Sequence, residues 1–559
     1  MLHRSLFASV QQLAPETLTP RELADRSLMM AQLTFLIHQH DDLKYYRRAI
    51  DTYVAEPFRG VDWQIQQMRD AGSGQLGDEA EWQQVVTRTL TIPAYLETAK
   101  ANLLAGKLAG NLPDKRMVQR DGIEGSRANA LYFRTTLGRT AQPFLGARPF
   151  AATMIAQILG AGMAAATAYE AFADFLAQTF DVNEAVDRYA AGEKEYEWRV
   201  HNVLRDPRSA AELYDYGAAQ VALYTARLVE VAREFSSNAK LNLPFGTPAD
   251  NYASVKRVMD FLGRDAPRDD TQLFRWYREA GARAVAYGRE HGLFEIPASY
   301  RLDVMETPPV LRSTIDAAYY PAPPFKQSGV GRFYLTPTGN DAEALKLNNF
   351  ASVATTAVHE GFPGHDWHFK FMTERARDIS NIRWLTPGAV EDSSAMWADS
   401  IAIEGWALYA EELMAEPVAN RRYGFYSPGE YLYELQGQLL RAVRIRVDVG
   451  LHTGRMSFDD AVDYFTEHVL FNPGARLRAA SDPAAKAALD SASRAIYRYS
   501  KWPTQAITYN LGKNAIIELR EACRAKTGAS FSPRQFHERF MAEGPIPVAY
   551  IRESFLAAC

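Results

Sequence analysis

Apolar residues recur at spacings of three and four along most of this chain, which is the pattern of amphipathic helices. Polar or proline-containing turns separate these stretches, so the pattern predicts a mainly helical protein. Residues 150–169 carry no charge over the length of a membrane span, but they are alanine-rich and interrupted by glycine and threonine. We therefore expect a close-packed buried helix there. The other predicted helices cover residues 21–36, 85–105, 183–204, 210–235, 271–290, 342–358, 431–449 and 514–525.

The segment HEGFPGH, which begins at His359, differs from the usual zinc-peptidase motif H-E-x-x-H by two extra residues between its histidines. On a regular helix His365 would lie about 240° around the axis from His359, where the two side chains cannot share one metal ion. Pro363 lacks an N–H and crowds the preceding turn, while Gly361 and Gly364 let the backbone leave helical geometry. The pattern predicts a broken helix that returns His365 to His359. The alternative is a helix that ends at Gly361 and leaves His365 on the surface.

A carboxylate on a later helix could complete such a site, because catalytic zinc uses three protein ligands and an open position for water. Residues 398–413 form a predicted helix in which Glu404 lies among apolar neighbours. Glu411 follows seven positions later and shares its face to within about 20°. The pair could serve as a ligand and as the group that orients a ligand. Alternatively, both are solvated helix carboxylates.

Five sequence blocks resemble the zinc metallohydrolases known as domain of unknown function 885, which are distant relatives of the gluzincin peptidases. The blocks follow the order of that family and lie in the C-terminal part of the chain. The N-terminal part fits more loosely, through DTYVAEPFRG at 51–60 and a helical stretch near 181–204. The five blocks are HEGFPGH at 359–365, EGWALYAEEL at 404–413, RAVRIRVDVGLH at 441–452, YRYSKWPTQAITYNLGK at 497–513 and FHERFMAEGPIPV at 536–548.

The resemblance implies a single Zn²⁺ ion held by His359, His365 and Glu404. It implies that Glu360 is the general base that takes a proton from the attacking water. Tyr509 matches the position where related peptidases present a phenol to the developing oxyanion, and a phenol keeps its proton near neutral pH. The alternative for Tyr509 is a buried core tyrosine.

Three further residues are candidates for contact with the site or its substrate. The charged residues of the block at 441–452 recur at helical spacing, which is more often structural than catalytic, and Arg446 lies among them. The resemblance suggests that His452 lies near the metal as a donor to substrate, against the commoner role of a structural histidine. Arg498 could bind a substrate carboxylate or form a structural ion pair.

The sequence also departs from the family pattern. Family members commonly carry a second histidine after the motif and a glutamine two places later, where this chain has Asp366 and His368 around a tryptophan. Thr504 replaces a common glycine, and Ala495 replaces a common glutamate. The proposed ligands and base are unaffected, but the wall of the site is altered. Asp366 and His368 could also orient the ligand histidines.

A short strand is expected shortly before the metal segment. Residues 331–336 read GRFYLT, with the bulk and β-branching of a strand, and Pro337 ends it. An irregular connector with prolines at 308–309 and 321–324 precedes it. An edge strand in this position can pair with an extended substrate backbone. The alternative is a plain hairpin at the rim.

Composition sets broader limits. Of 559 residues, 47% are hydrophobic and 23% charged, as in ordinary globular proteins. The net charge of −5, without long runs of one sign, gives no support for nucleic-acid binding. Two cysteines, Cys523 and Cys559, are too few for a disulfide scaffold or a thiolate cluster and indicate a cytosolic or redox-indifferent chain. The first residues contain too short an apolar run for a secretory signal, so we expect a cytoplasmic protein.

Together with the resemblance, these features predict a large helical zincin-like body with a deep active-site cleft and a small β-hairpin or sheet beside the metal helix. Residues 1–300 would form one wall of the cleft and residues 301–559 the zinc-binding catalytic part, in one compact unit. The leading hypothesis is a zinc-dependent hydrolase that cleaves amide or peptide bonds of small substrates. The alternatives are a metal-dependent reaction on a non-peptide small molecule and a non-enzymatic helical scaffold with a relic site. We expect no nucleic-acid or membrane partner, and the sequence leaves the oligomeric state open.

Overall fold

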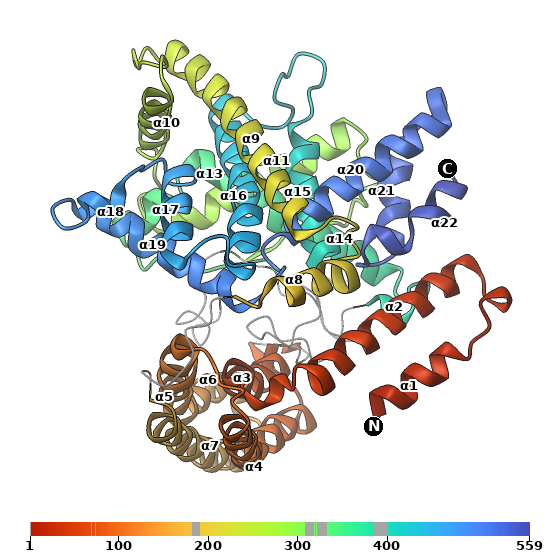
Figure 1. Ribbon diagram of the computed structural model, residues 1–559, viewed down its shortest axis with the longest axis vertical. Coiled ribbons are helices and arrows are strands. Elements are labelled where there is room, and N and C mark those ends of the chain that lie inside the picture. Colours follow the sequence, from red (N-terminus) through yellow and green to blue (C-terminus); the bar gives the residue numbers. More distant parts are fainter. Residues whose placement is uncertain are drawn as a thin grey trace.

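The computed structural model describes residues 2–66, 68, 70–72, 74–181, 190–307, 318, 320, 333–384 and 400–559. Helices account for 73% of the chain and strands for 2%, which confirms the prediction of a mainly helical protein. Figure 1 shows a smaller lobe of helices below a larger helical body. The N-terminal helices α1 (Leu2–Gln11) and α2 (Pro20–Ile37) run along one side.

The smaller lobe has a hydrophobic core of its own, formed by residues between Ala49 and Phe180. Helix α7 contacts α4, α5 and α6, and α4 also contacts α3. The buried Tyr169 hydroxyl on α7 donates to the Val54 carbonyl on α3 at 3.0 Å, which joins these two helices. The lobe consists of α3 (Ile50–Gln66), α4 (Glu79–Leu108), α5 (Gly125–Leu131), α6 (Leu137–Leu145) and α7 (Ala151–Thr179).

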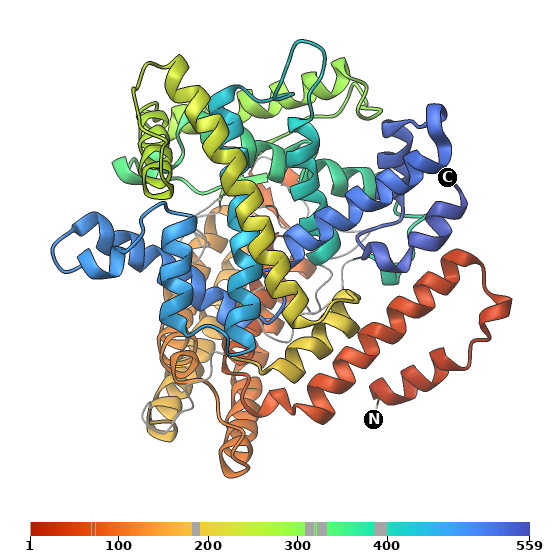
Figure 2. The ribbon, with the colours of Figure 1, turned by 45° about the horizontal axis from the view of Figure 1, so that its top comes forward.

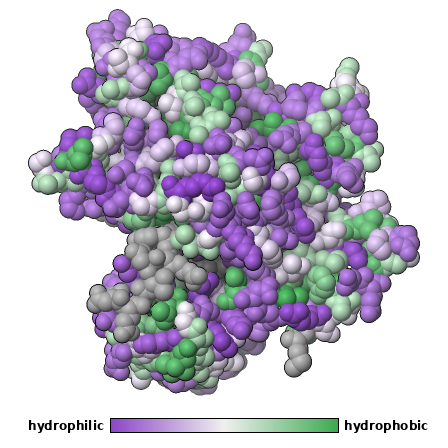
Figure 3. Space-filling view, in the orientation of Figure 1, coloured by the Kyte–Doolittle hydropathy of each residue, from purple (hydrophilic) through white to green (hydrophobic). Residues whose placement is uncertain are grey.

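Helix α7 contains the uncharged stretch and continues beyond its predicted end to Thr179. Among the described helices it is the one long and apolar enough to cross a membrane by length and composition, and 39% of its most apolar window is buried. Gly162 allows the close packing that the small residues predict, because a Cβ there would lie 2.4 Å from the Phe133 carbonyl oxygen. Leu159 and Met163 are about half exposed. Figure 3 shows apolar patches scattered over an otherwise polar face.

Two long helix pairs organise the larger body. Helix α9 (Ala210–Asn238) packs along α16 (Pro428–His452), and the two lie side by side in Figures 1 and 2. Helix α15 (Ser400–Ala415) packs against α20 (Thr508–Thr527). Helix α11 (Asp270–Glu290) packs beside the segment that precedes the candidate metal ligands. These helices carry most of the residues that the sequence singled out.

Helix starts follow the local sequence. Helices α2, α4, α9, α10, α16 and α17 begin with capping boxes, in which a Ser, Thr or Asp side chain and an acidic residue three positions on bond each other's backbone N–H. The remaining helices are α8 (Glu193–Arg199), α10 (Pro248–Leu262), α12 (Ala342–Leu347), α13 (Phe350–Thr356), α14 (His365–Glu374), α17 (Phe458–His468), α18 (Ala475–Arg478), α19 (Pro483–Lys501), α21 (Pro533–Ala542) and α22 (Arg552–Ala557).

Two predicted helices differ from the structure. The stretch 342–358 is two helices, because Asn349 caps α13 by accepting from the Ser352 N–H at 3.2 Å and so ends the preceding run. The stretch 183–204 begins as a helix only at Glu193, and residues 182–189 lie outside the described residues. A short π-helix, Val200–Leu204, ends it.

The expected strand is β4 (Phe333–Leu335), which pairs in parallel with β3 (Val304–Glu306). A parallel pair excludes the hairpin alternative for these strands, since a hairpin joins antiparallel neighbours. Phe333 shares a hydrophobic core with Ala357 and Phe369, so this small sheet lies beside the metal segment as predicted. The proline-containing connector lies almost wholly outside the described residues. A second small sheet pairs β1 (Asp70–Gly72) with β2 (Gln75–Leu76) in antiparallel fashion.

The hydrophobic cores show no boundary at residue 300, where the sequence analysis divided the chain into two parts. Residues from Leu28 to Tyr300 contribute to one core together with residues from Ala354 to Phe555. The core of the smaller lobe, by contrast, contains only residues 49–180. The N-terminal half is therefore divided, because helices α8, α9 and α11 complete the packing of the C-terminal part.

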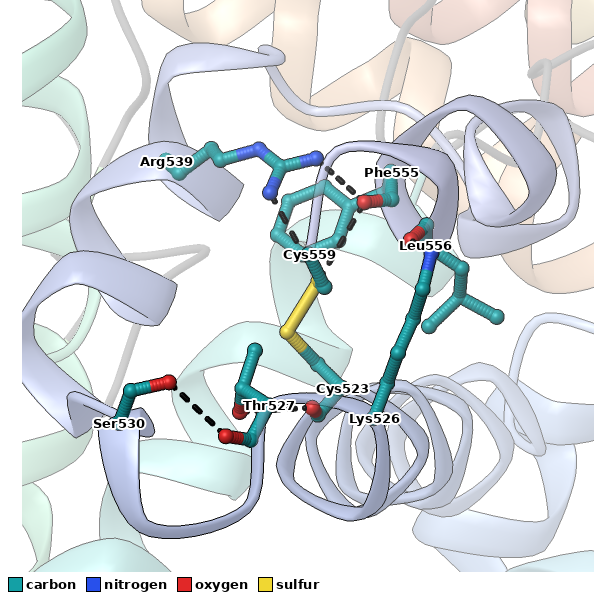
Figure 4. Close-up of a disulfide and its surroundings, with 8 residues drawn as sticks. All are labelled: Cys523, Lys526, Thr527, Ser530, Arg539, Phe555, Leu556 and Cys559. Atoms are coloured by element: carbon teal, nitrogen blue, oxygen red, sulfur yellow. Dashed lines mark hydrogen bonds between the residues drawn. A yellow bond between two sulfur atoms is a disulfide. The ribbon is translucent and has the colours of Figure 1, made fainter.

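Cys523 and Cys559 form a disulfide, with Cα atoms 5.6 Å apart across 36 residues of sequence. The small number of cysteines had indicated a cytosolic or redox-indifferent chain. Because the two cysteines are bonded to each other, the chain is not redox-indifferent. Figure 4 shows the bridge joining α20 to the end of the chain after α22, beside the Arg539 guanidinium. Two cysteines far apart in sequence gave no signal of their proximity, which arises only when α22 packs on α20.

Candidate metal centre

The helix that carries His359 is interrupted, as the six-residue spacing predicted. A short π-helix (Ala357–Gly361) ends there, and α14 begins at His365. The Gly364 N–H donates to the Val358 carbonyl at 3.0 Å, which folds the chain back on itself. A Cβ at Gly364 would lie 1.9 Å from the His359 carbonyl oxygen, so this return needs glycine.

The interruption brings the two imidazoles together. The ring centroids of His359 and His365 are 4.9 Å apart and nearly perpendicular. Glu404 Oε2 lies 3.3 Å from His359 Nε2 and 3.5 Å from His365 Nε2. One ligand atom from each of these three residues lies within 4.8 Å of the other two. The arrangement favours a shared cation over the surface position that the alternative gave His365, which is 5% exposed.

The crossing of α15 and α20 determines where Glu404 lies. A Cβ at Gly405 would lie 2.6 Å from the Gly512 Cα, and a Cβ at Gly512 would lie 1.9 Å from the Ile401 carbonyl oxygen. Both positions therefore need glycine for the two backbones to approach this closely. The close approach of Gly405 to Gly512 brings Glu404 on α15 near Tyr509 on α20.

Glu411 orients one of the histidines. Its Oε1 lies 2.6 Å from His359 Nδ1, and the carboxylate is fully buried. A hydrogen donated by Nδ1 leaves Nε2 directed at Glu404 and at the space between the three ligand atoms. Arg441 adds a cation 3.6 Å from the same Glu411 oxygen. Glu411 is fully buried, so the alternative of a solvated carboxylate is wrong for this residue.

Burial and neighbouring charge shift the pKa values of these groups. Burial lowers the pKa of His359, but the Glu404 and Glu411 carboxylates outweigh it and raise that pKa to about 10. Burial raises the pKa of Glu404, but hydrogen bonds from His359 and His365 hold it well below its ordinary value. The two shifts stabilise each other, because a protonated His359 faces an ionised Glu404.

Glu360 and Tyr509 lie beside this cluster. Burial raises the pKa of Glu360, and the nearby histidines oppose that shift. Burial and the Glu404 carboxylate raise the pKa of Tyr509, so its hydroxyl is protonated at neutral pH. Glu360 can therefore exchange a proton, and Tyr509 can donate a hydrogen bond.

Asp366 and His368 do not bond the ligand histidines. The Asp366 Oδ2 accepts from the Tyr300 hydroxyl at 2.8 Å and lies 3.0 Å from Lys370 Nζ. His368 has no hydrogen-bond partner among the described residues, and burial lowers its pKa to about 3, so its ring is neutral. Its ring lies 5.3 Å from that of Trp406.

Sequence reasoning missed two aromatic residues at the site. Trp406 Nε1 donates to the Pro363 carbonyl at 2.9 Å, which fastens the interruption to α15. The Tyr320 ring stacks on the His365 ring with centroids 6.3 Å apart. Trp406 lies two residues after Glu404 in the matching block, so its position was a usable signal. Tyr320 lies within the proline-containing connector, just before Pro321, and carried none.

Three predicted residues make no hydrogen bond, ion pair or ring contact with the candidate ligands within the described part of the chain. His452 Nδ1 accepts from the Ala191 N–H at 3.2 Å, and its Nε2 lies 3.1 Å from the Tyr499 carbonyl oxygen. Both ring nitrogens are thus engaged by backbone, which favours the structural alternative. Arg446 stacks on Tyr214, on the side of α16 that faces α9. Arg498 is exposed and lies over the Trp502 ring, 5.4 Å from its centroid.

Two cavities lined by described residues share no residue with the metal cluster. One of about 540 Å³ lies among α9, α10 and α17, and one of about 680 Å³ lies where α9 and α10 meet the start of α16. The deep cleft expected at the metal site stays a prediction.

Comparisons with known proteins bear on the family and the fold of this chain. No functionally curated protein matches the chain. A "putative lipoprotein of unknown function" from Shewanella oneidensis has a similar structure, with a TM-score of 0.71 and 18% identity over 99% of this chain and 91% of its own. A "putative lipoprotein" from Colwellia psychrerythraea gives a TM-score of 0.75 and 19% identity over 99% and 90%. At this identity the similarity shows only that each of the two proteins has the same fold as this chain.

A family model described as "Bacterial protein of unknown function (DUF885)" matches residues 2–555, nearly the whole chain. The protein therefore belongs to the DUF885 family.

Proposed function

We propose that this protein is a zinc-dependent hydrolase that cleaves amide or peptide bonds of small substrates. The observation that carries the proposal is the convergence of His359, His365 and Glu404, with Glu411 behind His359. Two imidazoles and one carboxylate, with a buried carboxylate orienting one imidazole, are the donor set of catalytic zinc.

The residues present fit such an ion. The Glu404 carboxylate has a pKa well below its ordinary value, and its Oε2 lies 3.3 Å and 3.5 Å from the Nε2 atoms of His359 and His365, which are the atoms that a cation would bind. A cation between the three ligand atoms would compensate the Glu404 charge and displace the proton that His359 retains. When bound, the ion would polarise a substrate carbonyl and lower the pKa of water.

The other groups supply proton transfer and hydrogen bonding. Glu360 follows a ligand in sequence, and its raised pKa suits a carboxylate that takes a proton from water and returns it to a leaving amine. The Tyr509 hydroxyl would donate to the oxygen that becomes negative in the transition state. Trp406 would hold the interruption so that both histidines keep their orientation.

The alternative substrate is a non-peptide small molecule, and the altered positions near the site motivated it. Thr504 donates its N–H to the buried Asp448 carboxylate at 3.1 Å, and Asp366 bonds Tyr300. The Asp366 bond gives that side chain a role in holding Tyr300, whereas the Thr504 bond uses only the backbone N–H. Small peptides are the first substrates to test, because activation of water by catalytic zinc suits amide hydrolysis.

We also propose an oxidising, extracytoplasmic location instead of the cytoplasmic one expected from the sequence. The Cys523–Cys559 disulfide supports it, because such bridges persist mainly outside the cytosol. The two structurally similar proteins are described as putative lipoproteins, which is consistent with it. Thiol labelling of protein isolated from its native source would test the proposal, and two reactive cysteines would contradict it.

Metal analysis and a pair of variants test the hydrolase. Purified protein should contain about one zinc per chain, and Glu404→Ala should lose it. Glu360→Gln should keep the metal and lose hydrolysis of a mixture of small peptides. If the purified protein contained no bound divalent metal, only the hypothesis of a non-enzymatic scaffold with a relic site would remain. Metal-bound protein that leaves peptides intact but consumes another metabolite in a Glu360-dependent way would favour the non-peptide alternative.

A further inference from the structure

Helix α16 presents two arginines to the ring of Tyr509. The Arg444 guanidinium lies 4.8 Å from the ring centroid, and the Arg441 guanidinium lies 5.7 Å from it. Arg441 has a carboxylate nearby, since its Nη2 is 3.6 Å from Glu411. Arg444 has none among the described residues, and its Nε donates instead to the Tyr499 hydroxyl at 2.9 Å. Arg444 is half-buried, and a guanidinium at such a position without a carboxylate is unusual, because burial of a charge is costly unless the charge is paired.

The Arg444 guanidinium, which has no carboxylate partner among the described residues, can bind an anionic ligand. A guanidinium has five N–H donors, and Arg444 uses some of them on the Tyr499 and Tyr509 side chains. Arg444 is partly exposed, so its remaining donors can meet solvent or substrate. Planar carboxylates match this donor geometry in a bidentate way. The charge of the exposed Arg498 opposes the rise in the pKa of Tyr509, so Arg498 adds a further cation near that ring, with no ion pair among the described residues.

We propose that Arg444 binds the C-terminal main-chain carboxylate of a peptide substrate, so that the enzyme releases residues from the C-terminal end. This inference rests on the proposed hydrolase for the reaction, but the carboxylate site stands on the arginine geometry. Tyr509 would contact the scissile carbonyl, and Arg444 lies against its ring. Since one residue spans about 3.5 Å, the terminal carboxylate would be one or two residues beyond the cleaved bond. Arg441 stays with Glu411.

Matched peptides test the source of the carboxylate. N-acetylated tripeptides with a free C-terminus are compared with the same tripeptides as C-terminal amides, and with amides whose last residue is glutamate. We expect at least a tenfold higher kcat/KM for the free acids than for either amide. Equal rates for acids and neutral amides would overturn the inference while leaving the hydrolase intact. A preference for the glutamate amides would also overturn it, by assigning the site to an acidic side chain.

Variants and binding separate this inference from the hydrolase itself. Arg444→Met should remove the preference for free acids, mainly through KM, without changing the zinc content. Arg455→Met is the control, because Arg455 lies just beyond α16 and pairs with Glu193 at 2.8 Å. Calorimetry of the same free acids and amides with zinc-loaded Glu360→Gln protein reports binding without turnover, even if no peptide is cleaved. Tighter binding of the acids that depends on Arg444 supports the site, and equal binding of acids and amides rejects it.

Discussion

Replacing Glu411 by glutamine removes the buried charge that orients His359 while keeping the shape of the side chain. Loss of a carboxylate partner behind a ligand histidine commonly weakens metal affinity by roughly 10- to 100-fold. This corresponds to about 1.4 to 2.7 kcal/mol of binding free energy. We expect a value near the upper end, because the bond between His359 Nδ1 and Glu411 is 2.6 Å long and wholly buried. Arg441 would also lose its carboxylate neighbour.

Competition for zinc against a chromophoric chelator measures the effect. Calorimetry in buffers of different ionisation heat should show fewer protons released by Glu411→Gln, because the pKa of His359 would be less strongly raised. Glu416→Gln is the control, since the partly exposed Glu416 lies just past the end of α15 and pairs with Arg520, not with His359. Zinc affinity within about twofold of the original protein would refute the reasoning that Glu411 orients a ligand.

Three other predictions concern stability and pH. Gly364→Ala should lower the free energy of unfolding by about 1 to 3 kcal/mol or more and release zinc, because its Cβ would overlap the His359 carbonyl. Gly160→Ala is the control, because a Cβ there enters open space on α7. It should leave stability unchanged or raise it in the same melting assay. In metal-free protein the pKa of His359 is raised to about 10 from 6.5, so its contribution to stability should be complete below pH 6.5 and lost as pH rises toward 10. Thermal melts against His359→Gln check this, and an equal pH dependence in both proteins would contradict it. Reducing the Cys523–Cys559 disulfide, which closes a loop of 36 residues, should cost about 4 kcal/mol. Denaturant titration with and without reductant measures this, and an unchanged midpoint would count against a bridge that restrains the unfolded chain.

The interruption of the metal helix was predictable because its causes are local. Two glycines and a proline between His359 and His365 change the backbone within one turn, and the spacing alone excludes a regular helix. The pairing of Glu404 with Glu411 on one face also follows from helical geometry. Parallel pairing of β3 with β4 could not be predicted in the same way, since the partner strand lies beyond a long irregular connector.

Residue roles were less predictable than residue positions. His452 and Arg446 belong to the same block as Arg444, yet the structure turns them toward backbone groups and toward Tyr214. Arg444, which the sequence gave no special role, lies against Tyr509. The direction of each side chain depends on how α16 is rotated between α9 and α20, and spacing along one helix does not fix that rotation.

The sequence by itself determined the helical character, the broken motif and the chemical types of the three candidate ligands, because these depend on residues a few positions apart. Only the tertiary structure decided that His359 meets Glu411, that α15 and α20 cross at Gly405 and Gly512, and that Cys523 reaches Cys559. The physical reason is that backbone geometry fixes short spacings, whereas contacts between distant segments depend on the packing of whole helices.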